Sequence, residues 1–196
     1  MNAPQTGGKR RYQMTARATA AAETERRILD ATVDLYTTRD YEDITFEEIA
    51  RRAKVAVPTL FRRFGSKEGL LEAASRHARQ AVITQRDAGL PGDVRSAVGN
   101  LLEHYELWGD RVLRLLAQEH RVPAIRAITD QGRAVHWRWV EQTFGPLLPL
   151  EESARARRVS QLVAVCDVYV WKVFRRDLGL SREETALALI EIIEAL

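Results

Sequence analysis

Residues 45–70, TFEEIARRAKVAVPTLFRRFGSKEGL, constrain the fold most, because they predict two short helices joined by a tight turn. Thr45 can cap the first helix while Glu48 returns the hydrogen bond, the arrangement known as a capping box. The connection after this helix leaves room for a turn of only about three or four residues. Pro58 suits the first turn of the second helix, and Gly65 suits its end. The segment therefore predicts a helix-turn-helix unit.

Positive charge is concentrated in the same stretch. Between Ile49 and Lys67 there is no acidic residue, and the basic residues are Arg51, Arg52, Lys54, Arg62, Arg63 and Lys67. Such a run is compatible with the solvated face of an ordinary surface helix. Its combination with a capped helix, a tight turn and a short second helix favours a recognition helix that enters the major groove of double-stranded DNA.

The rest of the chain predicts an all-α fold. Eleven glycines and six prolines in 196 residues leave long uninterrupted helical patterns, and no alternating strand pattern lies between hairpin turns. Apolar residues at helical spacing begin near Glu23 and continue to Thr38, which predicts the first helix there. From Ser66 another helix should run to about Arg86, long enough to join the helix-turn-helix to the C-terminal half of the chain.

The segment 23–71 resembles the N-terminal region of the TetR (tetracycline-repressor-like) transcriptional regulators. The residues that carry the resemblance are Arg27, Ile28, Leu29, Ala31, Ile44, Thr45, Ile49, Ala50, Thr59, Leu60, Phe61, Phe64, Ser66, Lys67, Glu68 and Leu70. Three positions depart from the family pattern. Lys54 stands where glycine is common in the turn, and Asp40 stands where glycine usually ends the first helix, although Asp tolerates a left-handed backbone. Ala56 replaces a serine or threonine cap worth about 1 kcal/mol.

The resemblance implies a three-helix helix-turn-helix DNA-binding domain, joined by a helix to a C-terminal helical bundle. On this basis we expect a flexible basic N-terminal arm (1–22), a DNA-binding domain (23–71) and a ligand-binding and dimerisation domain (72–196). It also implies a homodimeric regulator, a repressor released from its operator by a small-molecule effector. The residues by themselves argue for DNA binding and a separate helical domain.

The candidate DNA contacts lie in both helices of the turn. We expect Val57, Pro58, Thr59 and Arg62 to face base edges, and Thr45, Phe61, Arg63 and Lys67 to lie at phosphates. Lys54 can reach either, and Phe46 and Ala56 complete the candidate set. Phe61 stands where the family commonly has tyrosine, so it offers packing or a thymine-methyl contact in place of a hydroxyl.

Beyond Gly92 large apolar faces predict further helices. We expect a new helix to open at Gly109, and one helix to carry an apolar stripe from Val159 to Phe174. Ser181 and Glu184 predict a second capping box. Candidate dimer contacts in the last two helices are Leu162, Val170, Phe174, Leu187, Ile190 and Ile193. These residues are equally compatible with an intramolecular core.

Aromatic and histidine side chains gather in the same C-terminal region, which favours an apolar ligand pocket with a few polar groups. The candidates are Tyr105, Trp108, Leu116, His120, His136, Trp137, Cys166 and Tyr169. Ordinary core packing and exposed histidines account for each of these residues equally well.

Other classes of function find little support. No constellation of catalytic residues, glycine-rich phosphate loop or metal-binding histidine pair is present, so we expect no enzyme activity, cofactor or metal site. A single cysteine excludes an internal disulfide, and without an apolar stretch for a membrane helix we expect a cytoplasmic protein. A helical small-molecule binder or enzyme with an incidental basic segment, and an architectural DNA binder without effector, remain as alternatives.

Overall fold

The computed structural model describes the backbone of residues 7–196 and the side chains from Thr15 onward. Within these residues there is no strand, so the prediction of an all-α fold is confirmed. The longer helices are α1 (Gly7–Thr38), α2 (Phe46–Ala53), α3 (Val57–Phe64), α4 (Lys67–Arg86), α5 (Val94–Leu116), α6 (Pro123–Phe144), α7 (Glu152–Val165), α8 (Val168–Lys172) and α9 (Arg182–Glu194). Short turns η1 (Tyr41–Asp43) and η2 (Gly145–Leu147) and the π-helical η3 (Val173–Asp177) lie between them.

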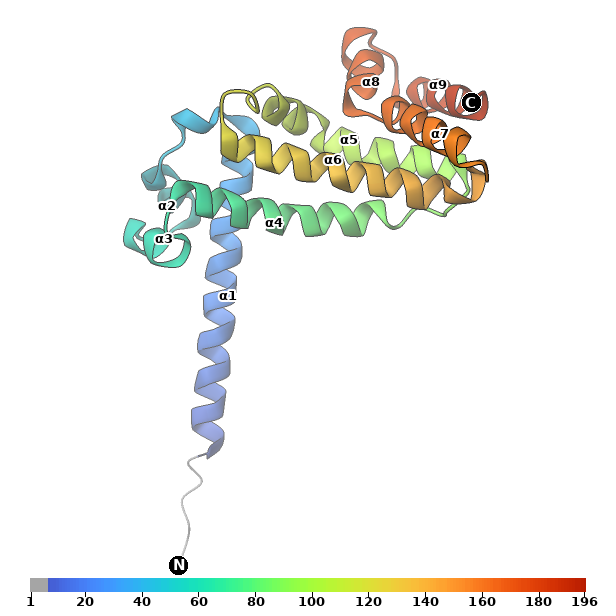
Figure 1. Ribbon diagram of the computed structural model, residues 1–196. Helices are drawn as coiled ribbons and strands as arrows, with labels where there is room; N and C mark the ends of the chain where they lie inside the picture. Colours follow the sequence, from blue (N-terminus) through green and yellow to red (C-terminus); the bar gives the residue numbers. More distant parts are fainter. Residues whose placement is uncertain (1–6) are drawn as a thin grey trace, which may run out of the picture.

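The helices form two packed groups that share α4. Helices α2 and α3 pack beside α1 and the start of α4, and we call residues 23–71 the head (Figure 1). We call residues 72–196 the body. There α4 runs along α5 and α6, while α7, α8 and α9 lie at the end far from the head (Figure 1). The N-terminal part of α1 projects away from both groups (Figure 1).

Helix α1 is longer than its apolar pattern predicts. The first helix was expected near Glu23, with a flexible arm before it or with residues 18–22 as a helical extension, and residues 7–22 in fact continue the helix toward the N-terminus. The alanines at 18 and 20–22 have the highest helix propensity, and no proline interrupts the segment. The expected arm is therefore helical over residues 7–22, and residues 1–6 lie outside the described part of the chain.

Helix α5 is continuous where a new helix was expected to open at Gly109. An added Cβ at Gly109 would lie 2.6 Å from Cη2 of Trp171, which is fully buried. The glycine therefore serves close packing of α5 against α8 rather than ending a helix. Trp171 also donates its indole N–H to Glu106 at 3.2 Å, so both ends of the ring are fixed by α5.

The expected single helix from Val159 to Phe174 is interrupted. Helix α7 ends at Val165, and Asp167 takes an extended conformation in which its carboxylate accepts a hydrogen bond from the Tyr169 amide at 2.9 Å. Aspartate favours caps over helix interiors for this reason. The capping box of Ser181 and Glu184 is present as predicted, with both reciprocal bonds formed.

Two apolar cores lie in the head and the body. Ile28, Ile49, Leu60 and Leu70 are completely buried in the head, and α6 adds the buried side chain of Ile125 to the same core. The body core contains Leu101, Phe144, Trp171 and Leu189, among others. Because α6 contributes to the head core, the head is packed onto the body by hydrophobic burial.

The packing at Gly109 gives a direct test of α5. Gly109→Ala should destabilise the protein by about 1–3 kcal/mol despite its better helix propensity, because the new methyl group meets the Trp171 ring. Gly99→Ala in the same helix meets nothing within 4 Å and should stabilise by about 0.5–1 kcal/mol. Urea unfolding of both variants measures the difference. Equal changes at the two sites would contradict this account of Gly109.

Candidate nucleic-acid interface and internal cavity

The turn between α2 and α3 depends on an unusual backbone at Lys54. This residue has φ 56° and ψ 50°, and among the described residues it is the only non-glycine with positive φ. Its amide N–H donates to the carbonyls of Ala50 and Arg51, which ends α2. Glycine, which is common at this position in the family, adopts this conformation without strain. Lysine adopts it at a steric cost, because its Cβ lies close to the following carbonyl oxygen.

The ends of the two helices differ in how they are capped. Thr45 accepts a hydrogen bond from the Glu48 amide at 3.3 Å, but the prediction of a return bond from the Glu48 side chain was wrong. The Glu48 carboxylate instead accepts from Arg39, which ties α2 to the end of α1. Ala56 precedes α3 with no side-chain cap, as expected, and Gly65 ends α3 with φ 75°. The buried side chain of Leu60 anchors α3 in the head core.

The predicted DNA contacts divide into an exposed set and a set held by the protein. Thr45, Lys54, Ala56, Pro58, Phe61 and Arg62 are exposed, and Val57, Thr59, Arg63 and Lys67 are half-buried. Phe46 is buried, and its ring meets that of Phe61 edge-on with centroids 4.5 Å apart. Its inclusion as a DNA contact was wrong, because as the first residue of α2 it points into the head core.

Most of the positive charge of residues 49–67 has a partner in the folded chain. Arg63 pairs with Glu25 of α1 at 2.8 Å, Arg52 pairs with Asp34, and Arg51 lies 3.9 Å from Glu48. The Lys67 ammonium donates to the Tyr41 carbonyl and lies 4.2 Å from the centre of the Tyr41 ring. The sequence could not show this, because each partner lies outside the basic stretch.

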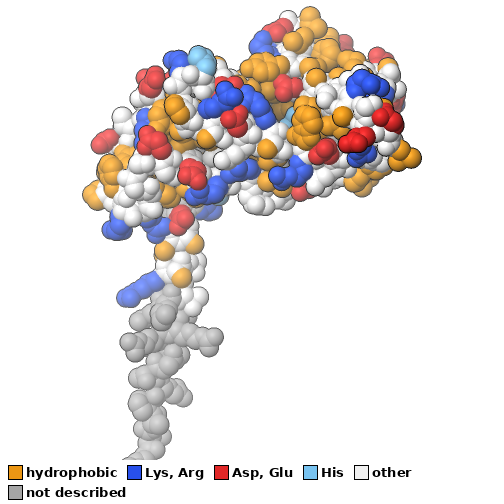
Figure 2. Space-filling model, viewed as in Figure 1, with side chains coloured by type: hydrophobic (Ala, Val, Ile, Leu, Met, Phe, Trp, Pro, Cys, Tyr) orange, Lys and Arg blue, Asp and Glu red, His pale blue; other side chains and the backbone are white. Residues whose placement is uncertain are grey.

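Unlike Lys67, which lacks an ion pair but donates to Tyr41, Lys54 and Arg62 have neither an ion pair nor a side-chain hydrogen bond among the described residues. Both are exposed, and they lie at the turn and on α3, respectively. Lys and Arg side chains lie along the lower edge of the head in Figure 2. These two cations are therefore available to phosphate or base edges without breaking a contact inside the protein.

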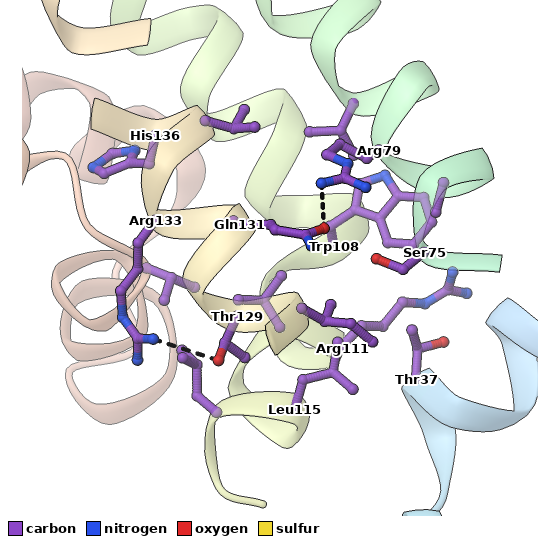
Figure 3. A pocket seen from close by; sticks show the side chains of 18 of the residues that line it. Thr37, Ser75, Arg79, Trp108, Arg111, Leu115, Thr129, Gln131, Arg133 and His136 are labelled. Carbon is purple, nitrogen blue, oxygen red and sulfur yellow. Dashed lines mark hydrogen bonds between the residues drawn. The ribbon is translucent and has the colours of Figure 1, made fainter. Parts of the chain in front are cut away.

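A cavity of about 230 Å³ lies between the head and the body. Its walls come from α1 (Val33, Tyr36, Thr37), α4 (from Leu71 to Arg86), α5 (from His104 to Leu116), α6 (from Ile128 to His136) and the start of α8. The volume of the cavity exceeds the roughly 150 Å³ of an engineered apolar cavity that accommodates benzene. In Figure 3, Arg79, Ser75 and Trp108 lie on one side, with Arg133 and His136 across from them. The cavity can therefore hold a small organic molecule.

Half of the predicted ligand contacts line this cavity. Tyr105, Trp108, Leu116 and His136 are in its wall. The other four lie elsewhere: His120, Trp137 and Tyr169 are exposed, and Cys166 is buried in the body core. Burial raises the pKa of the Cys166 thiol to about 12, so the side chain acts as a small apolar group.

Two polar side chains of the cavity wall, Arg86 and His136, contact each other. Arg86 is buried, and its guanidinium lies 4.1 Å from the centre of the Trp139 ring and 3.4 Å from Nδ1 of His136. His136 Nε2 is 3.1 Å from the Val163 carbonyl, which can only accept, so Nε2 carries the proton and Nδ1 accepts from Arg86. Burial lowers the pKa of Arg86 and of His136, and the charge of Arg86 lowers that of His136 further.

Sequence reasoning missed most of the polar cavity wall. Arg79, Arg86 and Arg111 line it, as do His104 and the α1 residues Val33, Tyr36 and Thr37. The arginines resemble the surface charges of any amphipathic helix, and α1 was assigned to the head alone. Only the packing of α4 against α5 and α6 shows that these side chains face one space.

The predicted dimer contacts are mostly internal. Leu162, Ile190 and Ile193 are buried in the body core, and Val170 and Phe174 are half-buried against it. Leu187 is exposed, together with Tyr169, Val173, Leu178 and Ile192. Hydrophobic side chains are at the surface at this end of the molecule in Figure 2. The apolar stripes of α7 and α9 therefore serve mainly to close the body core of one chain.

Two further classes of site receive no support from residues 15–196. No group of three or more His, Cys, Asp or Glu side chains there is arranged to hold a metal ion. No helix in the described part of the chain has the length and apolarity required to span a bilayer.

The head is similar in sequence to known bacterial regulatory proteins. Residues 28–74 match the model for bacterial regulatory proteins of the tetR family. The chain is 38% identical over 86 residues to the HTH-type transcriptional regulator YvkB of Bacillus subtilis, and 46% identical over 100 residues to the HTH-type transcriptional repressor KstR of Rhodococcus jostii. The match to YvkB spans 42% of this chain and 46% of that protein, and the match to KstR spans 51% of this chain and 44% of that protein. The chain thus matches about half the length of these relatives.

Solved structures extend the similarity of fold to the body. A transcriptional regulator from Rhodococcus sp. Rha1 superposes with a TM-score of 0.67, at 16% identity, over 87% of this chain and 94% of that one. A regulator from Saccharomonospora viridis, solved in complex with choline, superposes with a TM-score of 0.63, at 21% identity, over 88% and 96% of the two chains. At these identities the comparison concerns the fold alone.

The left-handed turn predicts a stability difference at Lys54. Lys54→Gly and Lys54→Ala remove the same charge, but only glycine adopts positive φ without steric cost. We expect Lys54→Gly to be more stable than Lys54→Ala by about 1 kcal/mol, measured by chemical unfolding at one ionic strength. A Lys54→Ala variant at least as stable as Lys54→Gly would contradict the assigned backbone strain.

The buried His104 predicts a pH dependence of stability. Burial, with the charges of Arg86 and His136, lowers the pKa of His104 from 6.5 to about 3. Between these values the unfolded chain binds the proton and the folded chain does not, so the free energy of unfolding falls as the pH falls. From pH 7 to pH 5 the loss from one such group is about 2 kcal/mol.

His104→Leu should remove that part of the pH dependence, whereas the exposed control His120→Leu should follow the wild type. Urea unfolding at the two pH values gives the comparison. If His104→Leu loses as much stability as the wild type, His104 titrates normally in the folded protein and its assigned environment is incorrect.

Proposed function

We propose that this chain, whose residues 28–74 match the model for bacterial regulatory proteins of the tetR family, is a sequence-specific DNA-binding transcriptional regulator controlled by a small molecule. One observation carries the second part: α1 and α4, which build the head, are also walls of the internal cavity. A molecule in the cavity touches the helices that hold the DNA-reading elements. The direction of control that we propose is release of a repressor from its operator.

In this proposal α3 reads the major groove of double-stranded DNA. Val57, Pro58, Thr59 and Arg62 meet base edges, since they lie on the first two turns of α3, as expected of a recognition helix. Neighbouring positions lie against the DNA sugar-phosphate backbone or against thymine methyl groups; these are Thr45, Lys54, Ala56 and Phe61. Arg63 and Lys67 have partners inside the head, so we assign them to holding α3 and α4 in place, with only a secondary part in phosphate binding.

We propose that the active form is a homodimer joined through the body. The exposed apolar side chains of Tyr169, Val173, Leu187 and Ile192 lie on α8, η3 and α9, at the end far from the head (Figure 1). Pairing two copies there sets the separation of two heads, which must match two half-sites about 34 Å apart. Val170 and Phe174 border this face.

Control then follows from unequal ligand affinity for two head separations. A ligand that binds better to one position of α4 shifts the population toward it, and DNA favours the position that matches its half-sites. The cavity favours a ligand-controlled regulator over an architectural DNA binder, because an architectural DNA binder requires no ligand cavity. A helical enzyme finds no catalytic constellation among the cavity residues.

Selection of bound duplexes from random DNA by the full chain tests the proposal. We expect enrichment of a single inverted repeat, whose affinity falls with rising salt. Binding that ignores sequence would favour an architectural role, and no binding at low salt would refute a DNA-binding function.

Two substitutions on α3 should separate specificity from affinity. Arg62→Ala should weaken binding to the selected duplex by about 1–3 kcal/mol, because an unpaired cation is removed from the interface. Thr59→Ala should instead change which base is selected at one position. Arg157 is an exposed arginine of α7 far from the head, and Arg157→Ala is the matched control. It should leave both the affinity for the selected duplex and the selected sequence unchanged. Binding isotherms and repeated selection give the two readouts; wild-type behaviour of both α3 variants would show that α3 does not read DNA.

A further inference from the structure

The cavity wall carries an excess of positive charge. Four arginines line it, and only Arg133 has carboxylate partners, Glu119 and Asp130. Arg79, Arg86 and Arg111 have no ion pair with any described side chain: Arg79 donates to Gln131, and Arg111 lies 5.1 Å from the centre of the Trp108 ring. Charges removed from water are normally paired, and of these three unpaired arginines Arg86 is buried while Arg79 and Arg111 are half-buried.

Arg86 makes the strongest case of the three. Its side chain is 4% exposed, and its Nε has no hydrogen-bond partner among the described residues. What it does contact is neutral: the Trp139 ring, the Tyr105 ring with its centre 6.0 Å away, and the unprotonated nitrogen of His136. Contacts with two aromatic rings and one long hydrogen bond compensate only part of the cost of burying a guanidinium. The site is therefore built for a charge that the chain itself does not supply.

The nearest acidic side chain in the wall cannot fill that role. Asp167 is the only carboxylate that lines the cavity among the described residues, and it accepts the Tyr169 amide hydrogen bond at the start of α8. It lies beyond the 4.0 Å ion-pair distance from Arg86, as do all other described carboxylates. The rest of the wall is largely aliphatic, with Leu71 and Val82 on α4, Val112 on α5 and Ile128 on α6.

We propose that the cavity takes an amphipathic organic anion, a carboxylate carried on an apolar body. The carboxylate pairs with the guanidinium of Arg86, where two parallel N–H donors match two oxygens. The apolar body lies along the aliphatic wall between α4 and α6, and Arg79 and Arg111 add to the attraction of the anion. This names the ligand class within the proposed function and rests on it for its regulatory meaning, although binding itself requires no DNA.

Calorimetric titration of the full chain with decanoate, decanol and decyltrimethylammonium, all below their micelle concentrations, tests the charge preference directly. The three probes share an apolar chain and differ in head-group charge. Decanoate should bind about tenfold or more tightly than decanol, with the cation weakest, as expected for a buried charge-assisted hydrogen bond. Equal affinities, tighter binding of decanol, or no binding of decanoate would each overturn the proposal.

Substitution of Arg86 then locates the preference. Arg86→Met keeps the length and apolar stem, and it should reduce the ratio of decanoate to decanol affinity to about one while raising the melting temperature of the free protein, because a buried unpaired charge is removed. Arg86→Lys, which keeps a cation, should retain part of the preference. Arg95→Met, an exposed arginine of α5 outside the cavity, is the matched control and should change neither quantity. Retention of the full preference by Arg86→Met would overturn the role of Arg86.

The wild-type titration stands even if a variant folds poorly. It also separates this inference from the proposed function. A protein that selects a DNA sequence but does not prefer decanoate refutes only the ligand class. A protein that prefers decanoate but selects no DNA refutes only the regulatory function.

Discussion

The head is fixed to the body where the connection after α1 meets the connection between α5 and α6. The Tyr41 amide donates to Oε1 of the buried Gln118 at 2.8 Å, and Asp40 lies 3.6 Å from both Arg114 and Arg121. The two half-exposed ion pairs are each worth little, about 0–1 kcal/mol. Burial of Val122 and Ile125 in the head core is the larger contribution, at about 1.5–3 kcal/mol for each side chain. Hydrophobic packing thus holds the head, and the polar contacts set its orientation.

Helix α4 is held at both ends and borders the cavity between them. At its start, Lys67 and Glu68 bond to Tyr41. At its end, Gln85 and Asn100 exchange side chain-to-backbone hydrogen bonds of 3.1 and 2.8 Å, which fix α4 to α5. In the proposed mechanism a ligand between these fixed points acts on the middle of the helix. Because packed interfaces have discrete arrangements, a small displacement there reaches the head as a change in its position.

Features governed by neighbours in the chain were predictable from the sequence. The tight turn at Lys54, the uncapped Ala56, the glycine end of α3 and the capping box at Ser181 all follow from local chemistry and appear in the structure. The helix count in the body did not follow, because Gly109 resembles a helix end until the Trp171 ring is placed against it.

Side-chain roles were harder to predict, because they depend on contacts between distant segments. Phe46 and Leu162 resemble site residues in a pattern, but each faces a core. Arg63 resembles a phosphate contact until Glu25 is seen beside it. Arg86 illustrates the same limit most clearly: its position at the end of a helix predicts a solvated charge, whereas the packing of α4 on α5 and α6 encloses it. Burial and partners across the fold decide these roles, and neither is a local property.

The most direct test of the central claim, that the cavity and the head share α4, is the affinity of the selected DNA duplex for a protein whose cavity is filled. Ala78→Trp places an indole in the cavity from α4, whereas Gln80→Trp adds the same ring on the exposed face of that helix. With folding and oligomeric state checked for both, we expect Ala78→Trp to lower the affinity about 5–150-fold, the usual range of allosteric coupling, and Gln80→Trp to leave it unchanged. Equal affinities for the two variants and the wild type would show that the cavity does not control the head.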